Sequence, residues 1–166
     1  MKGSIRQIDI EDAEKFLEML RKLDDETKFM MYEPGERKTS LVEQVEIIES
    51  NKKNGNPVFL VEAEEELVGF LGVRRGECNR VKHSAYMAIG VLEGYRGMGI
   101  GRRLMEELDR WAVGNNISRS ELTVMCHNER AVKLYEGMGY QIEGRRKKAV
   151  LVDGKFVDEY YMGKTY

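Results

Sequence analysis

One stretch of the sequence restricts the fold more than any other, because it joins a buried strand, a glycine-rich turn and an amphipathic helix. Residues 84–92 contain no charged side chain, which is typical of a strand buried on both faces. The turn at Arg96–Arg102 has glycine at every second position, at Gly97, Gly99 and Gly101. Beyond it, apolar residues recur on one helical face, at Leu104, Met105, Leu108, Trp111 and Ala112. Glycines at a helix start predict a phosphate or pyrophosphate site, with a ligand-free tight turn as the alternative.

Two common phosphate-binding motifs fail the spacing test. A dinucleotide-binding Gly-x-Gly-x-x-Gly would need glycine at position 102 or 104, where the sequence has Arg102 and Leu104. A P-loop would need Gly-Lys followed by Ser or Thr, but Gly101 precedes Arg102 and Arg103. If the turn binds a phosphate, it does so through another motif, to which Arg96 and the two later arginines add positive charge.

The rest of the chain mixes hairpins with helical crossovers. The sequence predicts a strand over 4–9, a helix through 13–23, a helix opened by a capping box from Ser40 to Glu43, a hairpin of 58–63 and 67–73, a strand over 121–126, a helix over 128–138 ended by Gly139, and a hairpin of 149–152 and 155–162 around Asp153-Gly154. Parallel pairing is expected where helices separate strands, at 84–92, at 121–126 and from Tyr140 onward. We therefore predict one α+β or α/β domain over residues 1–166, built on one mixed sheet.

Composition and charge exclude several classes of function. Lys and Arg number 27 against 29 Asp and Glu, so the formal net charge of −2 gives no general reason to bind nucleic acid. The chain has no uncharged run near the roughly 20 residues of a membrane span, and Met1–Leu20 lacks the apolar core of a signal peptide. Cys78 and Cys126 lack C-x-x-C spacing and are accompanied only by His83 and His127, so we expect no metal. Reduced thiols fit a cytoplasmic protein.

Two motifs in the right order resemble those of the GNAT N-acetyltransferase superfamily. Arg96-Gly97-Met98-Gly99-Ile100-Gly101 matches the Arg/Gln-x-x-Gly-x-Gly/Ala signature of that family. Residues 128–140 resemble its second motif, Asn-x-x-Ala-x-x-Leu-Tyr-x-x-x-Gly-Phe/Tyr. The resemblance covers about residues 67–162, whereas the N-terminal third matches only in its strand–helix–helix order.

The resemblance implies acetyl-CoA as the acetyl donor. It also implies a GNAT-like fold, with about seven strands in a mixed, mostly antiparallel sheet, about four helices and two splayed central strands. Backbone N–H groups of 97–102 would bind the CoA pyrophosphate, and the backbone of 89–91 would pair with the pantetheine arm. Asn128 would contact the cofactor and Tyr135 would face the thioester sulfur. The cofactor-binding residues predicted in this way are Ile89, Gly90, Val91, Arg96, Gly97, Met98, Gly99, Ile100, Gly101, Arg102 and Asn128.

Acetyl transfer to an amine requires a neutral amine, a polarised carbonyl and a proton for the leaving thiolate. We predict Tyr135 as the general acid, because a phenol with a pKa of about 10 can protonate a developing thiolate. Asn128 and Tyr135 share a helix face, since they are about two turns apart. Without the resemblance, Asn128 would be an ordinary helix N-cap and Tyr135 an ordinary core aromatic.

The general base is left open. Some family members carry a glutamate five residues before the asparagine, but that position is Thr123 here, which cannot act as a base. The remaining titratable candidates are His83, Glu33, Glu159 and His127. Cys126 could carry the acetyl group covalently, although a buried structural cysteine is the simpler interpretation.

The predicted function is transfer of an acetyl group to a primary amine of a small molecule, either an amino acid or a polyamine-like compound. The alternatives are a protein N-terminal or lysine acetyltransferase and a non-catalytic CoA-binding module. Acidic residues Glu26, Glu33, Asp158 and Glu159 could attract a cationic amine, while the basic run 145–148 could contact the CoA 3′-phosphate or an acidic partner. Because members of the family are often dimers, a homodimer is a further expectation.

Overall fold

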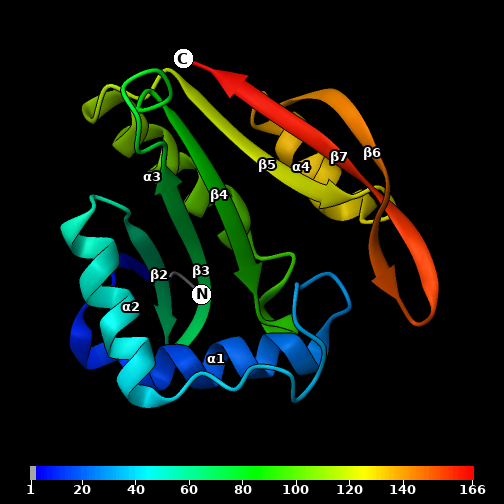
Figure 1. The fold of residues 1–166 in the computed structure, drawn as a ribbon. Coiled ribbons are helices and arrows are strands. Elements are labelled where there is room, and N and C mark those ends of the chain that lie inside the picture. The colour runs from blue at the N-terminus through cyan, green and yellow to red at the C-terminus, as the bar shows by residue number, and fades with distance from the viewer. Residues whose placement is uncertain (1–2) are drawn as a thin grey trace. The chain divides into compact units, whose positions relative to one another are not determined.

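The computed structural model describes residues 3–166, which form seven strands and four α-helices. In chain order the elements are β1 (Ser4–Gln7), the 3₁₀ turn η1 (Ile10–Asp12), α1 (Ala13–Glu26), α2 (Leu41–Lys53), β2 (Val58–Ala63), β3 (Glu66–Arg75), β4 (Ser84–Val91), the 3₁₀ turn η2 (Glu93–Tyr95), α3 (Ile100–Gly114), β5 (Arg119–Met125), α4 (Glu129–Gly137), β6 (Gln141–Val152) and β7 (Lys155–Thr165). Neighbouring strands follow the order β1-β2-β3-β4-β5-β7-β6 (Figure 1). The predicted α+β class with one mixed sheet is therefore confirmed.

The chain forms two compact units. The first comprises the chain up to Arg74 together with Ala88–Leu108, and the second comprises Arg75–Met87 together with Asp109–Tyr166. Strands β3 and β4 and helix α3 contribute residues to both units. A single functional domain over residues 1–166 stays a prediction.

In the first unit, β1, β2 and β3 pair antiparallel, and α1 and α2 bury their apolar faces against them. The hairpin between β2 and β3 turns through Glu64 and Glu65, whose φ values of 51° and 67° suit a two-residue turn with both central residues left-handed. The rings of Phe16 on α1 and Phe70 on β3 meet edge to face at 5.6 Å. The core cluster around them includes Leu20, Leu23, Ile48, Leu60 and Leu92.

The predicted capping box of α2 is present. Ser40 Oγ accepts a hydrogen bond from the backbone N–H of Glu43 at 3.2 Å, and the Glu43 carboxylate accepts one from the Ser40 N–H at 2.7 Å. These two bonds satisfy donors that the start of a helix leaves without partners. The sequence therefore determined where α2 begins.

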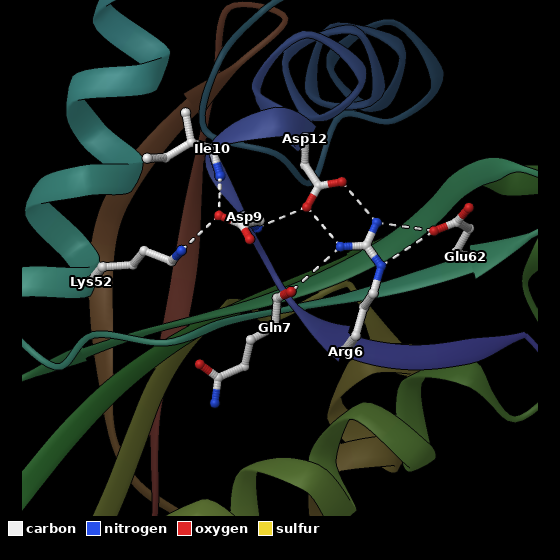
Figure 2. A network of polar contacts seen from close by, with 7 residues as sticks. All are labelled: Arg6, Gln7, Asp9, Ile10, Asp12, Lys52 and Glu62. Carbon is white, nitrogen blue, oxygen red and sulfur yellow. Dashed lines mark hydrogen bonds and ion pairs between the residues drawn. The ribbon is translucent and has the colours of Figure 1, made fainter.

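A polar network ties β1 to η1, β2 and α2 (Figure 2). Arg6 donates from two guanidinium nitrogens to the two carboxylate oxygens of Asp12, both at 2.7 Å, and also to Glu62 at 3.0 Å. Asp12 in turn accepts from the Asp9 N–H, and Asp9 accepts from the Lys52 ammonium, each at 2.8 Å. Asp9 and Asp12 form a second capping box, which the sequence analysis missed because aspartate replaces the usual glutamate or glutamine at its last position.

In the second unit, β7 lies between β5 and β6 and pairs antiparallel with both (Figure 1). On its other side β5 pairs in parallel with β4 over Ser84–Tyr86, where the parallel pairing expected between these two segments is present. The splaying of the two strands beyond this point stays a prediction. Parallel pairing from Tyr140 onward, which the sequence predicted, is wrong. The chain turns back after β6 and places β7, not β6, beside β5.

Strand β6 begins at Gln141, well before the predicted start at residue 149. Its first part, 141–148, is mostly exposed and ends in four charged residues, so only the apolar run at 149–152 predicted a strand. The predicted turn after it is confirmed, with φ values of 49° at Asp153 and 74° at Gly154. Gly139 follows α4 with a φ of 91°, as expected of a glycine that ends a helix.

Candidate active site

The glycine-rich turn of the first unit combines left-handed backbone with the start of a long helix. Gly97 and Gly99 have φ values of 82° and 77°, which other residues rarely adopt, whereas Gly101 already lies inside α3. The first hydrogen bond of the helix runs from the Arg103 N–H to the Gly99 carbonyl at 3.1 Å. The N–H groups of 100–102 precede that bond and have no helical carbonyl to reach. These N–H groups lie at the N-terminus of the helix, the positive end of its dipole, which favours binding of an anion.

The outer side of the turn is open. A Cβ built at Gly99 meets no protein atom within 4 Å. Met98 beside it is 52% exposed, whereas Ile100 is buried and anchors the first helical turn in the core. A ligand can therefore approach the backbone at Gly99 without displacing a side chain.

The predicted pantetheine segment, Ile89 to Val91, forms the half-buried end of β4. Gly90 has no room for a side chain, because a Cβ there would lie 2.8 Å from Phe70 Cε1 and 3.0 Å from Leu23 Cδ1. Glycine at this position is thus required by packing inside the first unit, whatever its role toward a cofactor.

The predicted arginines of the turn differ in their surroundings. Arg96 Nε donates to the Val91 carbonyl at 3.0 Å, so this arginine ties the turn to the end of β4. Arg102 is exposed on α3 and lies 4.0 Å from Glu106, one helical turn further on. The Arg96 side chain therefore has a positioning contact, whereas Arg102 adds positive charge at an accessible surface.

Asn128 and Tyr135 belong to the second unit, at the start and near the end of α4. Asn128 Oδ1 accepts from the Ala131 N–H at 3.3 Å, so the residue caps the helix as the sequence predicted. Tyr135 is the buried residue of α4, with 7% of its surface exposed. Within residues 3–166 its hydroxyl group makes no hydrogen bond. Burial raises the pKa of this phenol well above its ordinary value, and the nearby phenols of Tyr140 and Tyr86 raise it further.

The neighbouring Tyr140 differs from Tyr135 in that its hydroxyl group is hydrogen-bonded. Its ring centroid lies 6.1 Å from that of Tyr135, but its hydroxyl group is 2.6 Å from Ser120 Oγ. Ser120 also lies 3.1 Å from the Tyr166 hydroxyl, which donates to Asp109 at 2.7 Å. Burial raises the pKa of Tyr140 to about 12. Of the two adjacent buried phenols, only that of Tyr135 keeps its proton free of a protein partner among the described residues.

The candidate bases lie in different environments. His83 is exposed just before β4, and Glu33 is exposed in the loop before α2. Glu159 on β7 is only 5% exposed and forms an ion pair with Arg146 at 2.9 Å. Thr123, at the position where some family members have glutamate, lies 2.9 Å from the Tyr86 hydroxyl.

His127 is exposed and Cys126 is half-buried and reduced. Among the described residues, no three or more His, Cys, Asp or Glu side chains gather as a metal site would need. No helix within residues 3–166 is long and apolar enough to cross a membrane.

Strand pairing also brings together side chains that the sequence analysis treated separately. Thr123 on β5 is paired with Tyr161 on β7, and Arg146 on β6 is paired with Glu159. The tyrosines at 86 and 161 were the available signal, but the pairing partner of each strand had to be known before the residues could be combined.

The fold and the turn agree with one protein family. A family model described as "Acetyltransferase (GNAT) family" matches residues 17–140. That match spans well over half of the chain, and the chain belongs to this family.

Two curated relatives and one solved structure illustrate the similarity. The chain is 35% identical over 104 residues to L-amino acid N-acetyltransferase AaaT of Escherichia coli, a match that covers 60% of this chain and 62% of the relative. It is 37% identical over 97 residues to N-alpha-acetyltransferase RimI of Mycobacterium tuberculosis, covering 58% of each. The chain thus spans about three fifths of the length of these relatives. An acetyltransferase of the GNAT family from Streptococcus pneumoniae superposes with a TM-score of 0.95 at 27% identity, covering 99% of this chain and all of that one.

Proposed function

We propose that the chain is an N-acetyltransferase that moves the acetyl group of acetyl-CoA directly to a primary amine of a small molecule, with Tyr135 as general acid. The observation that carries this proposal is the open glycine turn, whose backbone N–H groups converge at the start of α3. Family membership and the similarity to two N-acetyltransferases support it.

In the proposed complex, the N–H groups of 97–102 hold the pyrophosphate of acetyl-CoA. The backbone of 89–91 pairs with the pantetheine arm, and Asn128 contacts the cofactor while it caps α4. Arg96 serves by fixing the Val91 carbonyl, and Arg102 adds positive charge beside the turn. The left-handed dihedral angles of Gly97 and Gly99 keep this backbone exposed to the ligand.

The reaction needs one proton donor for the leaving group. The neutral amine attacks the thioester carbonyl carbon, the carbon–sulfur bond breaks, and the departing thiolate takes the phenolic proton of Tyr135. The new N-acetyl group loses the extra amine proton to solvent, and the phenolate of Tyr135 regains a proton. The phenol is protonated at neutral pH. Burial raises its pKa and so makes it a weaker acid in the free protein, and the proton moves as negative charge develops on the departing sulfur.

The acceptor class depends on the residues of the site, since sites and not folds define substrates. AaaT is named for L-amino acids and RimI for N-alpha-acetylation, so both a free amino acid and a protein N-terminus fit the family. We favour a small-molecule acceptor. We further propose that residues 1–166 form one functional domain, that the protein works in the cytoplasm and that it forms a homodimer. A protein acetyltransferase and a non-catalytic CoA-binding module are the alternatives.

Calorimetric titration with acetyl-CoA, and with NAD as a negative control, tests the donor site. We expect binding of acetyl-CoA and none of NAD. Gly99→Val should abolish binding, because a branched side chain would fill the open space where the pyrophosphate lies. Gly94→Ala is the matched control, since its Cβ also meets no protein atom within 4 Å but its backbone is not left-handed.

Unchanged acetyl-CoA affinity in folded Gly99→Val would refute the donor site. A thiol-release assay with a panel of amines then tests turnover. Tight CoA binding without turnover of any small amine, peptide or protein lysine would favour the non-catalytic module.

A further inference from the structure

One face of the β5–β7–β6 sheet carries a paired carboxylate and guanidinium beside exposed aromatic rings. Paired residues on antiparallel strands point to the same face. Thr123 is paired with Tyr161, and the next pair on that face joins Met125 to Glu159. Glu159, on β7, is also paired with Arg146 on the edge strand β6. The second unit alone therefore builds this cluster.

The ion pair between Glu159 and Arg146 is unequal. Glu159 has 7% of its side chain exposed, whereas Arg146 has 43% exposed. Arg146 donates from Nη1 to Glu159 Oε1 at 2.9 Å, and its other guanidinium N–H groups meet no acceptor among residues 3–166. The second oxygen of Glu159 also accepts no hydrogen bond there. Because no fully buried polar side-chain atom of the described residues lacks a partner, solvent reaches that oxygen.

Aromatic rings border the pair. Arg146 lies over the Tyr161 ring at 5.4 Å from its centroid, and Tyr161 is half exposed. Tyr86 is 36% exposed, and its hydroxyl group binds Thr123, the strand partner of Tyr161. The Tyr86 phenol is also one of the neighbouring groups that raise the pKa of Tyr135, the proposed general acid.

We propose that this cluster binds the acetyl acceptor as a zwitterionic α-amino acid, with Arg146 holding the α-carboxylate and Glu159 the α-ammonium group. The assignment rests on the proposed function and names its substrate class. Two adjacent opposite charges match a ligand whose own opposite charges are separated by one carbon. The ligand would replace one ion pair by two charge-assisted contacts, and the guanidinium fork suits a carboxylate. Tyr161 and Tyr86 would border its side chain.

The same charges disfavour the other acceptors. A polyamine carries only positive charge, so it would be repelled by Arg146 and would offer this guanidinium no carboxylate. A protein N-terminus offers an ammonium group, but an amide carbonyl takes the place of the carboxylate. Discrimination between a free amino acid and its amide is therefore the property that this site predicts.

The test compares L-amino acids with their α-amides, which differ only in the carboxylate. Binding of each pair is measured by titration calorimetry in the presence of CoA, and acetylation by thiol release from acetyl-CoA. In the wild-type protein we expect amino acids with accepted side chains to bind about 10- to 100-fold more tightly than their amides. Arg146→Gln should remove this difference, and Glu159→Gln should weaken both members of each pair.

A matched control lies on the opposite face of the same hairpin. Arg145 forms an ion pair with Asp158 at 2.7 Å and lies 6.0 Å from the Tyr160 ring centroid, so its surroundings resemble those of Arg146. Arg145→Gln should keep the discrimination. Arg146→Lys retains a positive charge beside buried Glu159 and therefore protects folding. Because lysine lacks the two-pronged guanidinium, the preference for amino acids over their amides should decrease without vanishing.

Equal affinity for amino acids and amides, no binding of any amino acid, or an unchanged ratio in Arg146→Gln would overturn the assignment. If amines or peptides are still acetylated in those cases, the proposed function stands without it. If amino acids bind through Arg146 but no acceptor is acetylated, the site stands and the proposed function fails.

Discussion

The two adjacent buried tyrosines allow catalysis to be separated from stability. Tyr135→Phe removes a hydroxyl group that makes no hydrogen bond within residues 3–166, from a side chain that is 7% exposed. An unpaired hydroxyl in such a place contributes nothing to folding, so we expect the free energy of unfolding to change by less than about 0.5 kcal/mol. The turnover number should fall about 10²- to 10⁴-fold, as for loss of a general acid. Acetyl-CoA affinity should stay the same.

Tyr140→Phe is the control for this substitution. It removes the hydroxyl group that lies 2.6 Å from Ser120 Oγ, whose residue is fully buried. Loss of one partner from a buried hydrogen bond costs about 1–2 kcal/mol. For a chain of this size that corresponds to a fall in Tm of about 2–8 °C. Turnover by Tyr140→Phe at a temperature where it is folded should remain within a few-fold of wild type.

Thermal unfolding by circular dichroism and steady-state thiol release measure the two effects. The pH profile adds a third test, because the raised pKa keeps Tyr135 protonated above its ordinary range. Activity should therefore show no loss through Tyr135 ionisation below a pH of about 10. A wild-type rate in Tyr135→Phe, or a stability loss as large as that of Tyr140→Phe, would show that the phenol has a structural and not a catalytic role.

Three further perturbations test the first unit. Ser40→Ala removes the cap of α2 and should cost about 1 kcal/mol in denaturant unfolding, whereas no change would mean that the capping box contributes nothing. The contact with Arg6 lowers the Asp12 pKa, so its contribution to stability is complete above a pH of about 4 and is lost as the pH falls through the lowered value. In Asp12→Asn, the free energy of unfolding should depend less on pH in this acidic range, and an unchanged pH dependence would contradict the assignment. Gly90→Ala should cost about 1–3 kcal/mol, because its Cβ would meet the Phe70 ring, and a wild-type Tm would show that the ring can move aside.

Local chemistry in the sequence was enough to place most elements. Ser40 and Glu43 specified the start of α2, and Asp153-Gly154 specified the last hairpin. The two family motifs located the turn and α4, because each motif combines glycines or caps with a helical pattern on consecutive residues. Such signals act between residues a few positions apart, so they can be recognised in the sequence without knowledge of the fold.

Strand order was not accessible in the same way. Residues 141–148 of β6 lack an apolar run because this part of the edge strand is exposed. The parallel pairing predicted from Tyr140 onward does not form, because β7 lies between β5 and β6. The capping box at Asp9 and Asp12 was missed for a smaller reason, a shorter acid at the last position of the motif. Pairing with β7 stabilises β6, and the ion pair with Arg6 stabilises the capping box, although the local sequence indicates both only weakly.

The sequence by itself determined the family, the glycine turn and the pair Asn128 and Tyr135, since these depend on residue types at fixed short spacings. Only the tertiary structure showed that the Tyr135 hydroxyl makes no hydrogen bond within residues 3–166, whereas that of Tyr140 is bonded to Ser120. It alone set Glu159 beside Arg146, thirteen positions apart in the chain, and placed Arg146 over the exposed ring of Tyr161. The physical reason is that burial and charge pairing depend on which strands become neighbours, and that choice is made by the packing of the whole sheet.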